Sequence, residues 1–351
     1  MINDYGLAVY EKKMKLDTNA ISHIGRIIEN HSFSFTVFFD NHQYTNVKMS
    51  GKCTNKLILM KRNVAIGDFV QLSLEQENLI ILDVLPEYTK ISKKVSSNKT
   101  REQLLATNID VVLITIACDQ KFSLGLLERY LLAFSSSEFK IHLLLTKSDL
   151  RERYLFISEI IASTYPELKI LPVSIFDKNL DEKLLPLIKS STVVFIGASG
   201  SGKSSLINLL MRDNLQKVNE VKKKDHKGKH TTTNSVILPL SINDSSYLID
   251  TPGIKSIALW DKSDNDIFSD IQTLEKHCKY NNCTHQKGQT DCAILQAIEL
   301  GLLDKKRFDR YISFQKEVDR RKERTFEDRM KNNRAIKNRQ NLKRKSKKNF
   351  K

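Results

Sequence analysis

Short runs in which apolar and polar residues alternate dominate the first 94 residues of the chain. We predict six short strands, joined by turns rich in Asn, Gly, Asp and Pro, at residues 23–30, 33–40, 44–51, 56–61, 69–75 and 79–86. Strands of this number and length favour a small barrel or sandwich. The turn at Gly67 and Asp68, which opens a strand, fits a Greek-key barrel of the oligonucleotide-binding type.

Beyond a polar connection at 93–103 the pattern changes. Continuous apolar runs predict buried strands at 109–117, 140–146, 170–174 and 192–197, and amphipathic runs predict helices at 124–134 and 150–165. Strand and helix alternate, which indicates an α/β domain with a parallel sheet covered on both faces. Beyond Trp260 the chain becomes helical and polar. We therefore expect four parts: a barrel at 1–95, an α/β domain at 96–260, a helical domain at 261–319 and a tail at 320–351.

Composition narrows the class of protein. The 351 residues are 40% hydrophobic, which is ordinary for globular domains, and no apolar run approaches the roughly 18 residues that a membrane helix needs. The first residues mix acids and bases, unlike a secretory signal. We expect a cytoplasmic monomer that does not contact membranes.

The net charge of +16 is concentrated at one end. Residues 320–351 hold 15 Lys or Arg against three acidic residues, a net +12, which leaves +4 for the other 319 residues. Such a run binds nucleic acid by releasing counterions from phosphates, although it can also serve only to keep a protein soluble. In the barrel, five aromatic residues form either a base-stacking face or ordinary core: Phe33, Phe35, Phe38, Phe39 and Tyr44.

A phosphate-binding loop follows the last predicted strand. The sequence from residue 197 to 204 is GASGSGKS, between a strand and a helix, as the pattern of Gly, four residues, Gly, Lys and Ser requires. Its backbone amides and the helix N-terminus suit phosphate oxygens, with Lys203 on the terminal phosphates and Ser204 on Mg²⁺. The nucleotide-binding residues expected here are Gly197, Ala198, Ser199, Gly200, Ser201, Gly202, Lys203, Ser204 and Ser205.

Downstream, the strand YLID ends at Asp250 and is followed by Thr-Pro-Gly. The Asp250 carboxylate suits the magnesium shell, and the Gly253 N–H suits the terminal phosphate. Between the two motifs, a polar segment offers Thr231, Thr232 and Thr233 as further Mg²⁺ ligands when a triphosphate is bound.

The base is read elsewhere, at Thr146, Lys147, Ser148 and Asp149. The Asp149 carboxylate can accept from both N1–H and the exocyclic amine of guanine, a pair of donors that adenine lacks on that edge. We expect Lys147 to lie along the base and the backbone of Ser174 to contact the guanine oxygen. A capped helix start is the other explanation of this tetrapeptide.

The order of these motifs is a circular permutation of the usual GTPase order, because the guanine motif precedes the phosphate loop. A parallel sheet tolerates this, since its active edge is assembled from several strand ends. Ile254 follows Gly253, where many GTPases place a glutamine that orients the attacking water. Either His230 or a partner must then complete the catalytic site, unless His230 is only a bystander.

Cys278, Cys283, His285 and Cys292 follow the pattern C-x4-C-x-H-x6-C in a polar stretch. Zn²⁺ takes tetrahedral sets of Cys and His, and a filled shell of three Cys and one His is structural rather than catalytic. We therefore expect one zinc ion, with the two helices that follow packed on it.

Taken together, these residues resemble the ribosome small subunit-dependent GTPase A family, through TKSD, GASGSGKSSLIN, GKHTTT, DTPG, the Cys/His motif and a following RYISF. The resemblance implies an oligonucleotide-binding barrel, GTP hydrolysis stimulated by the small ribosomal subunit, and a role in late maturation of that subunit through its rRNA. It favours Thr232, ahead of Thr231, as the Mg²⁺ ligand and His230 as the catalytic candidate. Thr146 in place of the commoner Asn and the long basic tail depart from the family pattern.

Two other functions fit parts of the sequence. One is a nucleic-acid-binding protein with a passive guanine-nucleotide domain. The other is a phosphate-loop kinase, although the sequence has no signature of a lid or a second substrate pocket.

Overall fold

The computed structural model describes residues 4–15, 23–31, 34–75, 78–94, 102–134, 139–211, 235–240, 245–250, 266–286, 288–289, 291–320 and 323. The chain forms two compact units. One contains Met1–Lys93, Glu102–Leu124 and Ser137–Ile257, and the other contains Lys94–Arg101, Gly125–Ser136 and Ala258–Lys351. In the described part of the chain, no helix combines the length and apolar character that crossing a bilayer requires.

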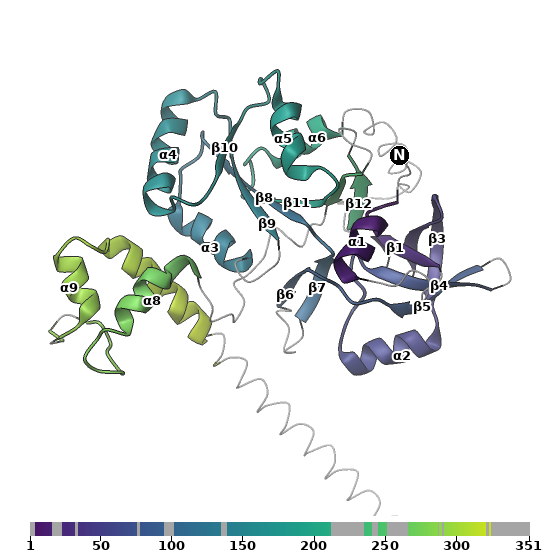
Figure 1. Cartoon of the computed structure of the whole chain (residues 1–351), viewed down its shortest axis with the longest axis horizontal. Helices are drawn as coiled ribbons and strands as arrows, with labels where there is room; N and C mark the ends of the chain where they lie inside the picture. Colours follow the sequence, from purple (N-terminus) through teal and green to yellow (C-terminus); the bar gives the residue numbers. More distant parts are fainter. Residues whose placement is uncertain are drawn as a thin grey trace, which may run out of the picture. The chain divides into compact units, whose positions relative to one another are not determined.

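A five-stranded barrel forms the N-terminal part of the first unit (Figure 1). Its strands are β1 (Ile24–Asn30), β2 (Phe35–Phe39), β3 (His42–Met49), β4 (Phe69–Glu75) and β5 (Asn78–Val84). Neighbouring strands are antiparallel except β3 and β5, and the pairing of β4 with β1 closes the barrel. The expected barrel is therefore present.

One of the six predicted strands is a helix. The run at 56–61 lies largely within α2 (Gly51–Met60), which begins where the Ser50 hydroxyl accepts from the Cys53 N–H at 3.1 Å. Cys53 and Leu57, four residues apart, are buried in the barrel core, whereas Ile58 is exposed. A short apolar run does not by itself distinguish helix from strand, and here the capping serine was the missed signal.

The aromatic residues of the barrel mostly belong to its core. Phe35 and Phe38 are buried, and Phe39 and Tyr44 pack partly buried against the core. Phe33 lies outside the described residues.

A parallel sheet forms the rest of this unit. Its strands are β8 (Val111–Ala117), β9 (Lys140–Thr146), β10 (Ile170–Val173), β11 (Thr192–Gly197) and β13 (Tyr247–Asp250), in the order β10-β9-β8-β11-β13. The expected parallel arrangement is confirmed, and residues 111–114 are buried on both faces. Helices α5 (Leu180–Ile188) and α6 (Lys203–Leu210) pack on one hydrophobic core with the strands, and α4 (Arg151–Thr164) connects β9 to β10.

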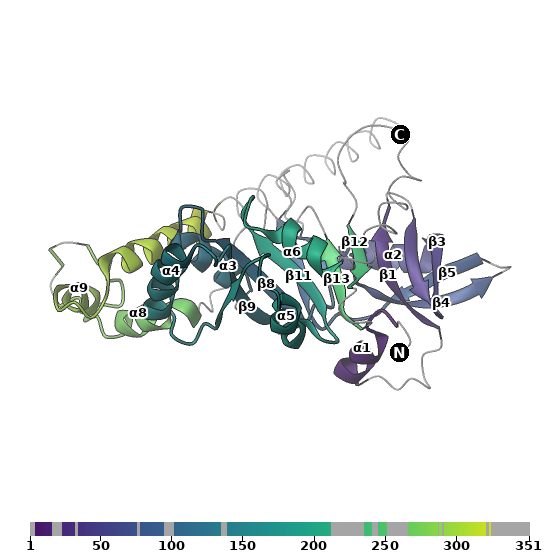
Figure 2. The same ribbon diagram turned by 90° about the horizontal axis from the view of Figure 1, so that it is seen from above.

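The barrel and the parallel sheet are joined by hydrogen bonding between strands. Strand β12 (Val236–Pro239) lies between β13 and β1 of the barrel (Figure 2). It is antiparallel to both strands, and Val236 pairs with Glu29 of β1. The two parts therefore share one continuous sheet.

A buried arginine strengthens this junction, beside helix α1 (Leu7–Met14). The Arg26 guanidinium donates to the carbonyls of Tyr5 (2.6 Å) and Asn108 (3.1 Å) and to the Thr192 hydroxyl (3.0 Å). It also lies 4.9 Å from the centre of the Phe69 ring. One side chain thus satisfies polar groups from the N-terminal segment, the connection before β8 and the start of β11.

The second unit is helical. It contains most of α3 (Leu124–Phe134), the short helices η2 (Asp266–Phe268), α8 (Ser269–Glu275) and α9 (Ala293–Glu299), and a helix over residues 305–320. Strands β6 (Lys90–Lys94) and β7 (Glu102–Thr107), which lie in the first unit except for Lys94, form a separate two-stranded sheet. The buried Glu128 carboxylate of α3 accepts from Arg310 at 2.7 Å. The predicted helix 124–134 is therefore hydrogen-bonded to the helix over residues 305–320.

We predict that Arg26→Ala lowers the free energy of unfolding by about 2–4 kcal/mol, because it leaves buried carbonyls without donors and opens a cavity. Urea unfolding monitored by circular dichroism measures this. Arg151→Ala, at an exposed position at the start of α4, should change it by less than about 0.5 kcal/mol. Equal effects of the two substitutions would show that the junction does not depend on Arg26.

Candidate functional site

Three strand ends bring the guanine-type motif and the phosphate-type loop together. Thr146 at the end of β9 pairs with Ala117 of β8, and Gly197 at the end of β11 pairs with Thr115 on the other side of β8. Because all three strands are parallel, their carboxyl ends lie at one edge of the sheet. The two motifs, about fifty residues apart in sequence, therefore flank the same strand end.

The loop between β11 and α6 has a backbone that requires glycine. Gly200 and Gly202 have φ values of +77° and +83°, in the left-handed region. A Cβ on Gly202 would lie 3.2 Å from the Thr146 hydroxyl, and a Cβ on Gly197 would lie 2.3 Å from the Thr115 hydroxyl. The loop is thus packed tightly onto the ends of β8 and β9.

Helix α6 begins at Lys203, directly after the left-handed Gly202. Amides at the first turn of a helix have no partner within the helix, and they carry partial positive charge. The Lys203 ammonium donates to the carbonyls of Gly197 (2.7 Å) and Ala198 (2.6 Å), so its charge lies over the loop. Ser204 and Ser205 are exposed on the first turn. This arrangement suits a phosphate group.

Thr146 links the two motifs directly. Its hydroxyl donates to the Ser201 carbonyl of the loop at 2.9 Å, and the Ser201 hydroxyl is 2.7 Å from that of Thr115. Thr146 and Ser201 are both buried. Thr146, which stands where asparagine is the commoner residue, therefore makes a direct hydrogen bond to the loop. This bond holds the loop next to the guanine-type motif.

The rest of the guanine-type motif follows β9, with Lys147 and Ser148 partly buried and Asp149 exposed. Lys147 has a left-handed φ of +57°, and its ammonium pairs with Asp119. Asp149 is exposed, and its carboxylate accepts from the Ser174 hydroxyl at 2.6 Å. Helix α4 starts at Arg151 with Leu150 as its N-cap, so the Asp149 side chain orients towards Ser174 rather than capping the helix.

Ser174 differs in detail from the sequence expectation. Its backbone N–H donates to the Asp177 carboxylate at 3.3 Å, and its hydroxyl also accepts from the Phe176 N–H. A hydrogen bond with Lys183 keeps the pKa of Asp177 below its ordinary value, so this carboxylate is charged at neutral pH. In this structure Ser174 orients Asp149 with its side chain, while its N–H is engaged within the turn.

Part of the expected magnesium and catalytic site lies outside the described residues: His230, Thr231, Thr232, Thr233, Gly253 and Ile254. Asp250 is described, and it is exposed at the end of β13. Since β13 runs parallel to β11, its carboxyl end lies at the same edge of the sheet as the loop.

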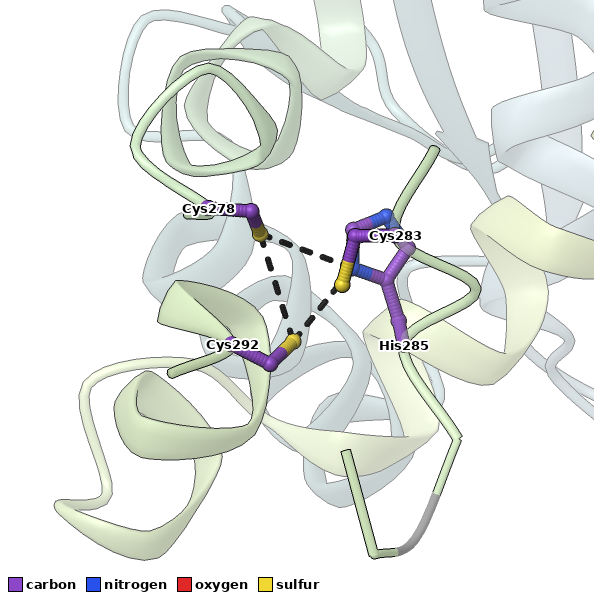
Figure 3. Close-up of side chains that lie close together, drawn as sticks. All are labelled: Cys278, Cys283, His285 and Cys292. Carbon is purple, nitrogen blue, oxygen red and sulfur yellow. Dashed lines mark hydrogen bonds between the residues drawn. The ribbon is translucent and has the colours of Figure 1, made fainter. Parts of the chain in front are cut away.

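The four residues of the Cys/His motif converge in the second unit (Figure 3). Their ligand atoms all lie within 4.8 Å of one another. The Cys278 sulfur is 4.0 Å from that of Cys292 and 3.7 Å from His285 Nδ1, and the Cys292 sulfur is 3.4 Å from Nδ1. Ligands 2.0–2.3 Å from a tetrahedral metal are about 3.5–3.8 Å apart, so Cys278, Cys283, His285 and Cys292 fit a metal shell.

The surroundings of this cluster support a metal. Glu275 faces the other ring nitrogen of His285 at 3.4 Å and accepts from the Tyr311 hydroxyl at 2.8 Å, an arrangement that orients a ligating histidine. Burial raises the pKa of the Cys292 thiol to about 11. A bound cation is what would stabilise its thiolate.

Sequence reasoning did not identify Glu275, Tyr311, Asp119 or Ser174 Oγ as part of these sites. Each acts through a contact with a residue distant in sequence, and no local pattern marks them. Tyr311 lies in the RYISF segment, whose sequence gives no sign of a contact with Glu275.

Comparisons with known proteins agree with the fold. Residues 84–260 match the family model described as RsgA GTPase. The chain is 33% identical over 276 residues to a small ribosomal subunit biogenesis GTPase, RsgA 1, from Oceanobacillus iheyensis, covering 77% of this chain and 78% of the relative. The fold is similar to YjeQ from Thermotoga maritima, with a TM-score of 0.61 and 20% identity over 84% of this chain and 98% of that one.

The fold is also similar to YloQ, described as a circularly permuted GTPase, with a TM-score of 0.57 and 22% identity over 85% of this chain and 95% of that one. The circular permutation that the order of the motifs predicts therefore agrees with the description of this matched structure. The chain belongs to the RsgA GTPase family.

Proposed function

We propose that the chain hydrolyses GTP and acts in the biogenesis of the small ribosomal subunit. The observation that carries the proposal is the hydrogen bond between Thr146 and the Ser201 carbonyl, because it holds a guanine-type motif against a phosphate-type loop. The names of the relatives support both the reaction and the ribosomal role.

In this proposal, one nucleotide spans the edge of the sheet. The base meets Asp149, and the phosphates meet the amides of the loop and the Lys203 ammonium. The Ser204 hydroxyl and, with a triphosphate bound, Thr232 would hold Mg²⁺, and the Asp250 carboxylate would contribute to the same site. The ion would supply positive charge beside the phosphates.

Hydrolysis needs a group that orients the attacking water. Ile254 has no polar side chain for this task. We infer that turnover by the chain alone is slow, and that His230 or the ribosomal subunit completes the site.

In this proposal the second unit is stabilised by a metal, and the tail contacts rRNA. The three cysteines and His285 would hold one Zn²⁺, which would stabilise the helical unit, and Glu275 would orient the histidine. The net +12 of residues 320–351 favours rRNA as the polyanion bound by a protein that acts as a monomer in the cytoplasm.

GTP turnover measured with and without purified small ribosomal subunits tests the function. We expect a slow basal rate that rises at least about tenfold with the subunits, by analogy with site completion by a partner in other GTPases. If the chain bound GTP but never hydrolysed it, with or without subunits, a nucleic-acid-binding protein with a passive nucleotide domain would be the correct description.

Asp149→Asn should transfer the base preference from guanine to xanthine. An amide cannot accept from both guanine donors, but it can donate to the extra carbonyl of xanthine. We expect GDP affinity to fall by about a hundredfold or more and xanthosine diphosphate affinity to rise, in equilibrium binding assays. Glu159→Gln, an equal change of charge at an exposed position of α4, should leave both affinities unchanged. If the preference does not shift, Asp149 does not read the base.

Cys283→Ser should remove the metal, because it replaces a thiolate ligand with a hydroxyl. Elemental analysis should give about one zinc per chain for the unsubstituted protein and nearly none for the variant. Asn282→Ser, at the exposed neighbouring position, should retain the metal. GDP affinity should stay within about twofold in both, and a parallel loss of zinc and GDP affinity in Cys283→Ser would contradict the separate roles of the two sites.

A further inference from the structure

A segment that the sequence motifs do not include reaches the phosphate-type loop. Gln120 lies just after β8, and its side-chain Nε2 donates to the Ser199 carbonyl at 3.0 Å. A Cβ built on Gly200 would lie 2.6 Å from the same nitrogen. The Gln120 amide therefore lies directly against the loop at the peptide that joins Ser199 to Gly200.

This contact determines where the Gly200 amide points. In a trans peptide the C=O and N–H groups point in opposite directions. Because the Ser199 carbonyl is directed to Gln120, the Gly200 N–H is directed away from it. Thr146 acts in the same way on the peptide that joins Ser201 to Gly202. Its hydroxyl donates to the Ser201 carbonyl, so the Gly202 N–H points away from Thr146.

The other carbonyls of the loop are held from a different direction. The Lys203 ammonium donates to the carbonyls of Gly197 and Ala198, so its hydrogen bonds do not duplicate the one from Gln120 to Ser199. Side-chain donors thus hold four carbonyls of the loop, two of them through Lys203, one through Thr146 and one through Gln120. Without the Gln120 contact, the peptide at Gly200 can rotate, since left-handed and right-handed conformations are both open to glycine.

Gln120 is itself held in position. Arg153, near the start of α4, donates to the Gln120 carbonyl at 2.7 Å and to the Cys118 carbonyl at 3.1 Å. The Gln120 N–H donates to Ala117 at the end of β8. Asp119 pairs with Lys147 of the base-reading motif. Residues 118–120 are therefore held by Arg153 and Lys147, which lie in or beside the guanine-type motif, while Gln120 contacts the phosphate-type loop.

We propose that Gln120 is a positioning residue of the nucleotide site, which orients the Gly200 amide towards a bound phosphate. The inference rests on the proposed function, since it assigns a role within the same GTP site. Gln120 acts on the ligand through the loop, so its contribution should depend on the phosphates of the ligand and not on its base.

The test compares GDP with guanosine, which has the same base and no phosphate. In Gln120→Met the donor is lost at similar side-chain length, and we expect GDP affinity to fall about threefold to tenfold, as for one hydrogen bond. In Gln120→Glu an acceptor faces the Ser199 carbonyl and adds negative charge near the phosphates, so the loss should be greater. Guanosine affinity, measured by competition against a fluorescent GDP analogue, should change less than about twofold.

Gln43→Glu on strand β3 of the barrel is the matched control, because it makes the same change of charge at an exposed glutamine. It should leave GDP affinity unchanged. Thermal midpoints measured without nucleotide show whether the Gln120 variants fold normally. Unchanged GDP affinity in both Gln120 variants, or an equal loss for GDP and guanosine, would overturn the inference.

Lys203→Ala separates this inference from the proposed function. If the unsubstituted chain does not bind GDP, or if Lys203→Ala binds it as well as the unsubstituted chain, the proposed nucleotide site itself is wrong. If Lys203→Ala loses GDP affinity and Gln120→Glu does not, only the role of Gln120 is wrong.

Discussion

The hydrogen bond from the Thr146 hydroxyl to the Ser201 carbonyl is the contact on which the candidate nucleotide site depends. It lies across the end of β8, the strand between the two that carry the motifs. The bond is buried, so water does not replace it readily, and it fixes the distance between the guanine-type motif and the phosphate-type loop. Both segments are on the ends of regular strands, which makes that distance a property of the sheet.

The same constraint explains why a permuted chain can keep a GTPase site. The order of strands in space is set by side-chain burial and backbone pairing, and neither depends on which strand is synthesised first. Here β8 and β9 precede β11 in the chain, yet all three have their carboxyl ends at one edge.

The sequence was most informative where one physical effect dominates. Strands β8, β9 and β11 were predicted within two residues at each end, because continuous apolar runs between polar ends leave little choice. The convergence of the Cys/His residues was also predictable, because four candidate ligands within a short segment can reach one ion without help from the rest of the fold. The helix α2 was mistaken for a strand because a short apolar run satisfies both patterns, and tertiary packing decides between them.

Contacts between distant residues were not predictable in this way. Arg26 reaches Thr192, Gln120 reaches Ser199 and Glu275 meets His285 only because the fold brings them together. No spacing rule marks such residues, and ordinary glutamates and glutamines are common on protein surfaces. Spacing patterns therefore indicate candidate ligand-binding groups, whereas they do not indicate the residues that contact those groups in the folded chain.

A crystal structure of the chain with GDP and Mg²⁺ tests the central claim most directly. The account predicts a single GDP whose base edge lies within hydrogen-bond distance of the Asp149 carboxylate and whose phosphates accept from the amides of Gly200–Ser204. A diphosphate in the loop with its base turned away from Asp149, or two separate ligands on the two segments, would contradict it.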